Sequence, residues 1–408
     1  MNASASQSAH AFDTWGLQAC PYMPVFGPPA VMFERGSGTE LWDSTGRRYL
    51  DFLSGVAVTS LGHAHPRVAA AVAEQANTLL HVSNFFANPV ATRAALALNE
   101  LLAAAGAGEG QVFFCNSGAE ANECALKLAR KFGGRGRHVV VSAYGSFHGR
   151  TLATLAATGQ PMKHEPFHPM PDGFRHAAWG DVDALVQAVD STVSAVLIEP
   201  VQGEGGVLPA PEGYLRAIRE LCDQRGMLMI VDEVQTGFGR TGEWFGFQHA
   251  GIAPDVVTLA KAIGNGMPVG ACWARRDVAQ VFRPGDHGST YSGTPIATAA
   301  VLAVIEEMQR IDAPRLAVRR GEQLAAGLRA LPGVVEVRGQ GLLLGAELVP
   351  GLDAKAVAAG ALDAGLVVNA VTASALRLTP PLTVSAAEID EAMETLRVVL
   401  GAISEGDH

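Results

Sequence analysis

The chain of 408 residues has only five cysteines, and no two of them form a CxxC pair. This scarcity excludes a disulfide-stabilised secreted scaffold and a cysteine-rich zinc site. Three of the five lie inside apolar runs, where a free thiol behaves as a small hydrophobe. We therefore expect free thiols and a protein of the reducing cytoplasm. The five are Cys20, Cys115, Cys124, Cys222 and Cys272.

Positive charge is also scarce, with 30 Lys and Arg against 40 Asp and Glu and a formal net charge of −10. That balance removes the electrostatic basis for binding nucleic acid or an anionic membrane. No uninterrupted run of 18 apolar residues is present, so we expect no membrane span. The first residues, MNASASQSAHAFD, lack the basic and apolar regions of a signal peptide. Small molecules are the expected ligands.

Three common ligand motifs are missing or fail on their context. No GxxxxGK[ST] phosphate loop occurs. His164 to His168 read HEPFH, which matches HExxH, but the surrounding prolines oppose the regular helix that would align two histidines. Gly237 to Gly242 read GFGRTG, which matches GxGxxG, yet the residues that follow do not open a helix. We expect neither a metal site nor a dinucleotide site.

The middle of the chain alternates helical stretches with five short apolar strands, VFFC, HVVVS, AVLIEP, LMIVDE and VVTLAK. This alternation predicts an α/β fold with a mostly parallel sheet flanked by helices. Residues 31–52 predict antiparallel strands, and the C-terminal part predicts a smaller α+β domain on which those strands pack. We divide the chain into a mobile tail (1–15), an N-terminal segment packing with the small domain (16–60), a large cofactor-binding domain (61–288), and an interdomain helix with the C-terminal small domain (289–408).

Asp232 and Lys261 each close an apolar, strand-like run, 29 residues apart. A lysine amine can form a Schiff base with the aldehyde of pyridoxal 5′-phosphate, and a carboxylate can keep the pyridine nitrogen protonated. Alone, each residue has an ordinary interpretation. An Asp at a strand end usually accepts a hydrogen bond in a turn, and a Lys after an apolar run is usually the solvated end of a strand. A third segment favours the cofactor.

That segment, QVFFCNSGAEANECALKLARKF, predicts a buried strand over 112–115, a turn over 116–118 and a helix over 119–131. Ser117 and Gly118 would leave backbone N–H groups uncrowded at the positive end of the helix dipole, where a phosphate can bind. An ordinary Ser or Asn helix cap is the alternative for this segment taken alone.

Seven stretches in order carry a resemblance: LGHAHP, HVSN, NSGAEAN, FHGRT, EPVQGEGGV, DEVQTGFGRTG and HGSTY. With them, the chain from about Val31 to its end resembles the class III pyridoxal-phosphate aminotransferases, and is most similar to the acetylornithine aminotransferases among them. The resemblance implies the fold type I architecture, a large domain with a mostly parallel sheet plus a smaller α+β domain. It also implies a homodimer with shared active sites.

The resemblance assigns cofactor roles to matching residues. Lys261 would hold the cofactor and then move the proton, and Asp232 would pair with the pyridinium nitrogen. Phe147 and Val234 would press on the two faces of the ring, with Gln235 near its phenolic oxygen. Backbone N–H groups of Gly118 and Ala119 would bind the phosphate, and Thr290 would reach it from the neighbouring subunit. Many members have Thr in place of Ala119.

Substrate roles follow in the same way. Arg150, assisted by Ser289, would bind the substrate α-carboxylate in a bidentate fork. Glu204 would mask Arg377 during the ω-amine half-reaction and release it for glutamate. Surface ion pairing is the ordinary alternative for these three charges. Phe26 stands where ornithine aminotransferases have a tyrosine that recognises a free α-amine, which favours an acylated donor. Asn265 and the run Ser292 to Thr294 also depart from the family pattern.

The implied reaction transfers the δ-amino group of N2-acetyl-L-ornithine to 2-oxoglutarate, a step of arginine biosynthesis. Other ω-amines, namely ornithine, 4-aminobutyrate or succinyl-diaminopimelate, remain alternatives, as does an aminomutase using the same cofactor. A non-enzymatic binding protein would be expected to lack Lys261 or Asp232, and both are present.

Overall fold

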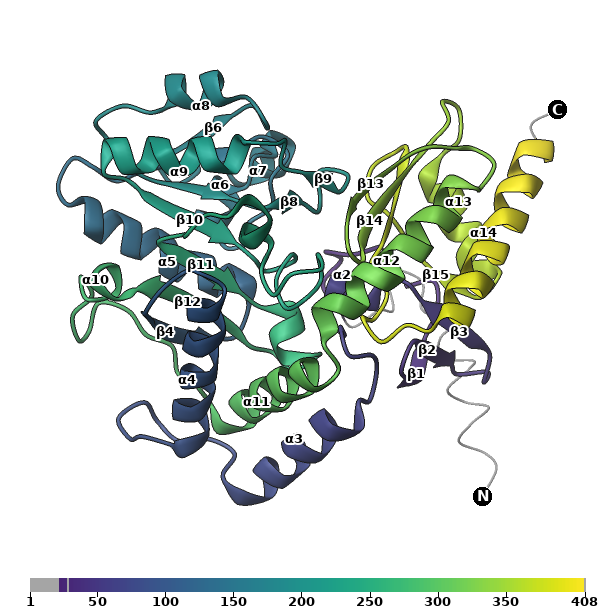
Figure 1. The fold of residues 1–408 in the computed structure, drawn as a ribbon, viewed down its shortest axis with the longest axis horizontal. Coiled ribbons are helices and arrows are strands. Elements are labelled where there is room, and N and C mark those ends of the chain that lie inside the picture. The colour runs from purple at the N-terminus through teal and green to yellow at the C-terminus, as the bar shows by residue number, and fades with distance from the viewer. Residues whose placement is uncertain (1–21, 28, 407–408) are drawn as a thin grey trace.

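The computed structural model describes residues 22–27 and 29–406. The predicted tail (1–15) and Cys20 lie outside the described residues. A seven-stranded sheet forms the centre of the larger part of the molecule (Figure 1). Its strands in spatial order are β4 (Gly110–Cys115), β12 (Gly270–Arg275), β11 (Val256–Leu259), β10 (Leu228–Asp232), β7 (Val193–Ile198), β5 (Val139–Ala143) and β6 (Phe174–Ala177).

The sheet is mostly parallel, as predicted, and the five strands expected from their apolar runs are confirmed. Strands β11, β10, β7, β5 and β6 are joined in parallel pairs. Two strands were missed by the sequence analysis. The short strand β6 extends one edge, and β12 runs antiparallel to both of its neighbours, β11 and β4.

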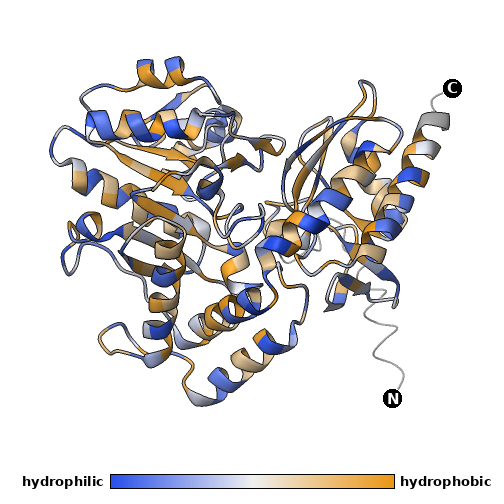
Figure 2. Cartoon of the chain, in the orientation of Figure 1, coloured by the Kyte–Doolittle hydropathy of each residue, from blue (hydrophilic) through white to orange (hydrophobic). Residues whose placement is uncertain are grey.

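Alternate residues of the strands pack on opposite faces of this sheet. Along β10, Leu228 and Ile230 pack in a cluster with helix α5 (Gly118–Gly133), whereas Met229 and Val231 belong to the main core with α9 (Tyr214–Arg225). Helices therefore cover both faces. Figure 2 shows the result, with apolar strands inside and polar residues on the outer faces of the helices. The remaining long helices of this part are α3 (Pro66–Thr78), α4 (Pro89–Ala104) and α11 (Pro295–Arg310).

The smaller part joins the C-terminal residues to the N-terminal strands. Its first sheet begins with three antiparallel strands, β1 (Phe33–Ser37), β2 (Glu40–Asp43) and β3 (Arg48–Asp51). A fourth strand, β15 (Leu366–Val367), pairs in parallel with β3. A second sheet has the order β13 (Val334–Gln340), β14 (Leu343–Leu348), β17 (Ala375–Leu378) and β16 (Asn369–Ala370). Helices α12 (Ala313–Arg329), α13 (Ala354–Asp363) and α14 (Ala386–Gly406) pack beside these strands (Figure 1).

The HEPFH segment does not form one regular helix. A single turn, α7 (Pro161–His164), ends where a short 3-10 turn, Glu165–Phe167, begins. Within residues 22–27 and 29–406, no group of three or more His, Cys, Asp or Glu side chains is arranged to hold a metal ion. No helix in the same described ranges is long and apolar enough to cross a membrane.

Candidate active site

A cavity of about 380 Å³ opens where the C-terminal ends of β10 and β11 meet the start of α5. It brings together ten of the residues that the sequence singled out. They are Ser117, Gly118, Ala119, Phe147, Arg150, Glu204, Asp232, Val234, Gln235 and Lys261.

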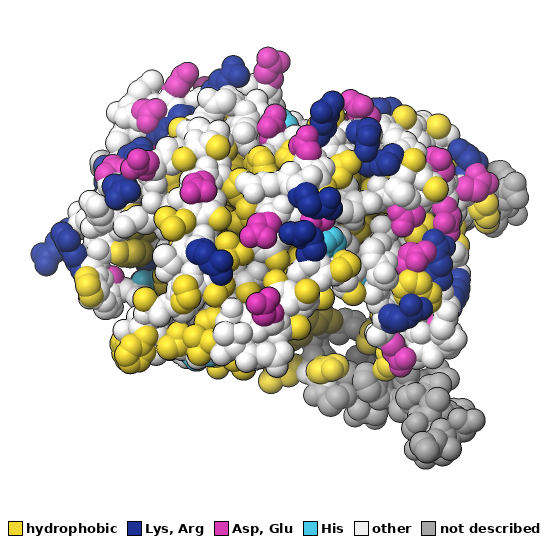
Figure 3. All heavy atoms as spheres, turned by 60° about the horizontal axis from the view of Figure 1, so that its bottom comes forward, with side chains coloured by type: hydrophobic (Ala, Val, Ile, Leu, Met, Phe, Trp, Pro, Cys, Tyr) yellow, Lys and Arg dark blue, Asp and Glu magenta, His cyan; other side chains and the backbone are white. Residues whose placement is uncertain are grey.

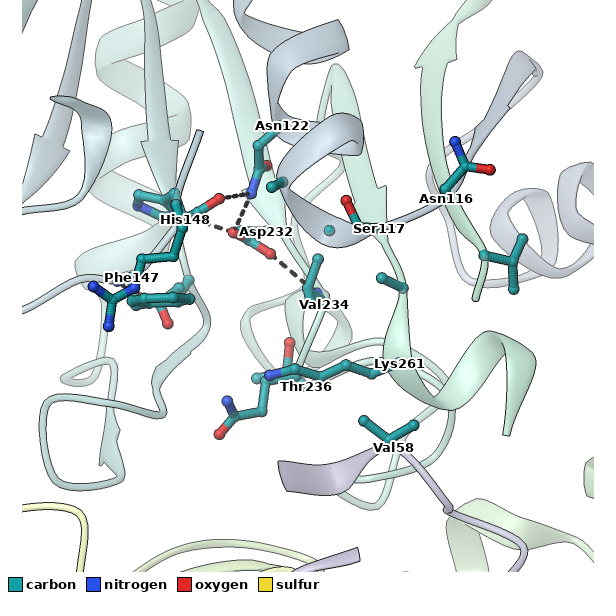
Figure 4. Close-up of a pocket in the computed structure, with 18 of the residues that line it drawn as sticks. Val58, Asn116, Ser117, Asn122, Phe147, His148, Asp232, Val234, Thr236 and Lys261 are labelled. Atoms are coloured by element: carbon teal, nitrogen blue, oxygen red, sulfur yellow. Dashed lines mark hydrogen bonds and ion pairs between the residues drawn. The ribbon is translucent and has the colours of Figure 1, made fainter. Parts of the chain in front are cut away.

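Asp232 ends β10 and is held by three hydrogen-bond donors rather than by a cation (Figure 4). Its Oδ2 accepts from His148 Nδ1 and from Asn122 Nδ2, each at 2.8 Å, and its Oδ1 accepts from the Val234 N–H at 3.0 Å. Charge-assisted bonds of this kind fix both the charge and the direction of a buried carboxylate.

Sequence reasoning gave no role to Asn122 or His148, although both lie in the NSGAEAN and FHGRT stretches. Asn122 also donates to the His148 backbone carbonyl at 2.8 Å, so the two residues hold each other as well as Asp232. His148 is buried, and its Nε2 has no partner in the described chain. The signal in the sequence was only that both positions fall inside the motifs.

Lys261 follows β11 and opens a 3-10 turn, Lys261–Gly264, with a left-handed backbone (φ 51°) that is rare for residues other than glycine. Strained backbone of this kind is concentrated at functional sites. Burial of the amine, and next the charge of Arg377, lower the pKa of Lys261 to about 8. A neutral, nucleophilic amine is therefore accessible near neutral pH.

The start of α5 forms an anion cradle at one end of the cavity. Ser117 is the N-cap, and its Oγ accepts from the Glu120 N–H at 3.2 Å, so the predicted cap is also present. A Cβ on Gly118 would lie 2.9 Å from Val234 Cγ1, closer than carbon atoms pack. Only glycine leaves these N–H groups open at the positive end of the helix dipole.

A second buried acid, Glu199, lines the same cavity and was quoted in the sequence only as part of a motif. Its Oε2 accepts from the Phe147 N–H at 3.2 Å. Burial, and next the neighbouring Asp232 carboxylate, raise the pKa of Glu199 well above its ordinary value. Burial and the neighbouring carboxylate therefore both favour the protonated form of Glu199.

The cation Arg150 lies at the exposed side of the cavity. Its guanidinium carbon is 5.6 Å from the centre of the Phe147 ring, and it makes no ion pair in the part of the chain that the structure describes. An unpaired guanidinium at a cavity mouth is suited to a carboxylate ligand.

Arg377, on β17, is buried and reaches the cavity through Glu204. Its Nη1 donates to Glu204 Oε1 at 2.5 Å and to the Gly203 carbonyl at 3.2 Å, while Nη2 donates to Asn369 Oδ1 at 2.8 Å. Burial acts to raise the pKa of Glu204, but the charge and hydrogen bond of Arg377 outweigh it, so the pKa lies below its ordinary value. The predicted pair is thus formed and ionised.

Three residues named in the sequence do not line the cavity of their own chain. Ser289 Oγ accepts from Asn116 Nδ2 at 3.2 Å beside the cradle, and Thr290 follows it. Phe26 is 86% exposed.

Two departures from the family pattern have local roles in the fold. Asn265 adopts a left-handed backbone (φ 47°) and hydrogen-bonds the backbone of Leu61 and Gly62. Asn tolerates this conformation better than other residues with a Cβ. Ser292 Oγ donates to the Phe114 carbonyl at 2.5 Å, which anchors the segment after Thr290 to the end of β4.

The cavity fits pyridoxal 5′-phosphate on its own chemistry: an open helix N-terminus for phosphate, a low-pKa lysine for an aldehyde, and an oriented carboxylate for a ring N–H. Comparison with known proteins identifies the class. The family model described as aminotransferase class III matches residues 23–400, so the chain belongs to that family of pyridoxal-phosphate-dependent enzymes.

Individual proteins of known name or structure are also similar to this chain. An acetylornithine aminotransferase of Gloeobacter violaceus is 49% identical over 390 residues, covering 93% of this chain and 96% of that protein. The ornithine aminotransferase of Toxoplasma gondii has a TM-score of 0.90 at 32% identity, covering 98% of this chain and 96% of that one. An amine transaminase from an uncultivated Pseudomonas species, solved with pyridoxal phosphate bound, has a TM-score of 0.86 at 29% identity, covering 93% of this chain and 98% of that one.

Proposed function

We propose that this aminotransferase transfers the δ-amino group of N2-acetyl-L-ornithine to 2-oxoglutarate, giving N-acetyl-L-glutamate 5-semialdehyde and L-glutamate in arginine biosynthesis in the cytoplasm. The observation that carries this proposal is the ionised Glu204–Arg377 pair, set in one cavity with an unpaired Arg150 and with Lys261. The relatives named acetylornithine aminotransferase support the choice of donor.

When bound, the cofactor would supply the electron sink for removal of a proton from the carbon that carries the reacting amine. Lys261 is the group that receives and returns that proton, and its low pKa suits a base working near neutral pH. Asp232, fixed by Asn122 and His148, holds a proton at the ring nitrogen. Phe147 and Val234 would confine the ring plane, the N–H groups of Gly118 and Ala119 would bind the phosphate, and Gln235 would lie near the phenolic oxygen.

Two half-reactions need two different arrangements of charge. With the ω-amine donor, Glu204 neutralises Arg377, and Arg150 with Ser289 binds the distant α-carboxylate. With glutamate or 2-oxoglutarate, Glu204 releases Arg377, which takes the carboxylate next to the reacting carbon, while Arg150 takes the other one. The unfavourable burial of an unpaired Arg377 would limit this second arrangement to substrates that bring a carboxylate.

We further propose a homodimer in which Thr290 reaches the phosphate of the neighbouring subunit, with residues 61–288 as the cofactor-binding domain. Large apolar side chains are exposed in the α3–α4 connection, including Phe85 (91% exposed) and Phe86 (67%), and Tyr291 is exposed beside Thr290. Figure 3 brings this side of the molecule forward and shows hydrophobic side chains gathered along it. Contiguous exposed apolar surface is typical of protein interfaces.

Ornithine is the second candidate donor, because the solved ornithine aminotransferase has closely similar geometry over the whole chain. The presence of Phe26 rather than tyrosine favours an acylated amine over it.

The deciding experiment is an absorbance titration of the cofactor-loaded protein with N2-acetylornithine, ornithine and 4-aminobutyrate, following conversion from the pyridoxal to the pyridoxamine form. Fast, saturable conversion by acetylornithine, with glutamate formed only after 2-oxoglutarate is added, supports the proposal. Equal or better conversion by another amine moves the assignment to that donor. Amine transfer without 2-oxoglutarate would indicate a mutase, and a protein that never binds the cofactor would overturn the site.

A further inference from the structure

Two cysteines that lie far apart in the sequence meet behind the cofactor helix. Cys124 lies on the inner face of α5, and Cys272 lies on β12 beneath it. Both are buried in the same apolar cluster, and both line one cavity. The established chemistry of the active site uses neither residue.

A second cavity gives access to the pair. It measures about 270 Å³, and both thiols line it together with the rings of Phe113 and Phe282. Phe113 and Phe282 are only partly buried, so the cavity reaches the surface. A small polar reagent has room to enter, since a single water needs roughly 30 Å³.

Lys127 and His287 lie beside this cavity, near Cys124. The His287 ring packs against Phe113, with centroids 4.7 Å apart, and against Phe282, with centroids 6.0 Å apart. Lys127 Nζ donates to His287 Nδ1 at 3.0 Å and to the Asp286 carbonyl at 2.7 Å. The hydrogen bond from Cys272, and next the His287 imidazole, hold the pKa of the Cys124 thiol below its ordinary value against the effect of burial.

The other two described cysteines lack this environment. Burial raises the pKa of Cys222 to about 12, and it raises the pKa of Cys115 further. Cys222 Sγ donates only to the Leu228 carbonyl, at 3.7 Å. Thiolate character and access, rather than the number of thiols, decide which cysteine reacts.

We infer that Cys124 and Cys272 form a hydroperoxide-reactive dithiol, with Cys124 as the attacking thiol and Cys272 as the resolving one. The Cys124 thiolate attacks one peroxide oxygen, the O–O bond breaks, and the departing hydroxide takes a proton to leave as water, giving a sulfenic acid. The Cys272 sulfur then attacks the Cys124 sulfur, the S–O bond breaks, and the hydroxide leaves as a second water with the Cys272 proton. Two thiols are oxidised by two electrons, and one hydrogen peroxide is reduced to two waters.

The test uses the cofactor-loaded, full-length protein carrying Cys20→Ser, so that this cysteine cannot contribute. After treatment with hydrogen peroxide and alkylation of the remaining thiols, intact mass and peptide mapping should show a Cys124–Cys272 disulfide and a loss of about 2 Da, reversed by dithiothreitol. In Cys272→Ser, Cys124 should instead stop at a sulfenic acid that a dimedone probe captures. Cys222→Ser is the matched buried-thiol control and should oxidise like the parent.

Lys127→Met tests the activating pair separately, and it should slow oxidation about tenfold by lowering the thiolate fraction. The inference is overturned if the parent protein keeps both thiols while an added free thiol is consumed. It is also overturned if Cys115 or Cys222 is oxidised as fast as Cys124. The wild-type peptide map alone decides these outcomes if a variant fails to fold.

Discussion

At the residue scale, the notable feature of the site is that three hydrogen-bond donors hold the Asp232 carboxylate. Asn122, His148 and the Val234 N–H supply the donors, and each donor is itself fixed by the fold. In the apolar interior the members of such a network strengthen one another's hydrogen bonds. The ring proton of the cofactor therefore depends on residues that never touch the substrate.

We predict that Asn122→Ala lowers kcat about tenfold, because removing one hydrogen bond to a charged group typically costs about 1.5–3 kcal/mol. The donor KM should change little, since no substrate contact is lost. Steady-state kinetics with a pH titration of the cofactor absorbance would check both effects. Asn77→Ala on the exposed face of α3 is the control. An unchanged kcat and an unchanged titration in Asn122→Ala would show that Asp232 does not need this donor.

A second residue-scale prediction concerns pH. The pKa of Lys261 is lowered to about 8, and only the neutral amine attacks the cofactor aldehyde. Covalent capture of pyridoxal phosphate by the cofactor-free protein should therefore rise with pH and level off above about 8, well below the ordinary lysine pKa of about 10.4. Stopped-flow absorbance at a series of pH values measures the capture rate.

Lys261→Ala is the control for this measurement and should give no covalent capture and no turnover while remaining folded. A rate that still climbs steeply between pH 9 and 10 would contradict the low pKa. Near wild-type transamination by the alanine variant would remove Lys261 from its role.

At the scale of elements, the strand–turn–helix unit of β4 and α5 supplies both the cradle for phosphate and the donor for Asp232. We predict that Gly118→Ala weakens pyridoxal-phosphate affinity about tenfold, because its Cβ would lie 2.9 Å from Val234 Cγ1 and must displace the ring-facing valine or the helix start. Equilibrium dialysis of the cofactor gives the affinity. Gly401→Ala in α14, where nothing lies within 4 Å of the new Cβ, should leave it unchanged. Equal affinities in the two variants would mean that this close approach is not needed.

The elements also show what a sequence can and cannot predict. Buried apolar runs and helix caps are local signals, so five central strands and the long helices could be predicted. Strand direction is not local: β12 is antiparallel because the short connection from β11 through Lys261 leaves no room for a crossover helix. The motif residues Asp232 and Lys261 were found by their spacing. The contacts of Asn122, His148 and Glu199 around Asp232 could not be predicted, because a single sequence does not indicate which distant side chains lie together in the fold.

At the scale of the whole molecule, the two parts are joined by a buried cation. Arg240 lies in the loop after β10 and donates to the Leu342 and Pro380 carbonyls and to Ser60 Oγ. Burial with no acidic partner lowers the pKa of Arg240 to about 9. One guanidinium in the loop after β10 therefore links the N-terminal segment and the C-terminal part to the large sheet.

The proposed dimer gives the last prediction. Phe85 and Phe86 expose apolar rings in the α3–α4 connection, and Asn84 of the same connection donates to the Ser289 carbonyl beside Thr290. Replacing both rings with aspartate should convert the protein to a monomer, because two like charges would replace apolar contacts in a desolvated interface. Light scattering would give the mass in solution. If Thr290 reaches the phosphate of the neighbouring subunit, the monomer should also lose pyridoxal-phosphate affinity about tenfold, measured by dialysis. Val335→Asp, at a residue that is 59% exposed on β13 in the smaller part, should change neither property. A monomer that binds the cofactor as tightly as the parent would refute the shared site, and a double variant that stays dimeric would place the interface elsewhere.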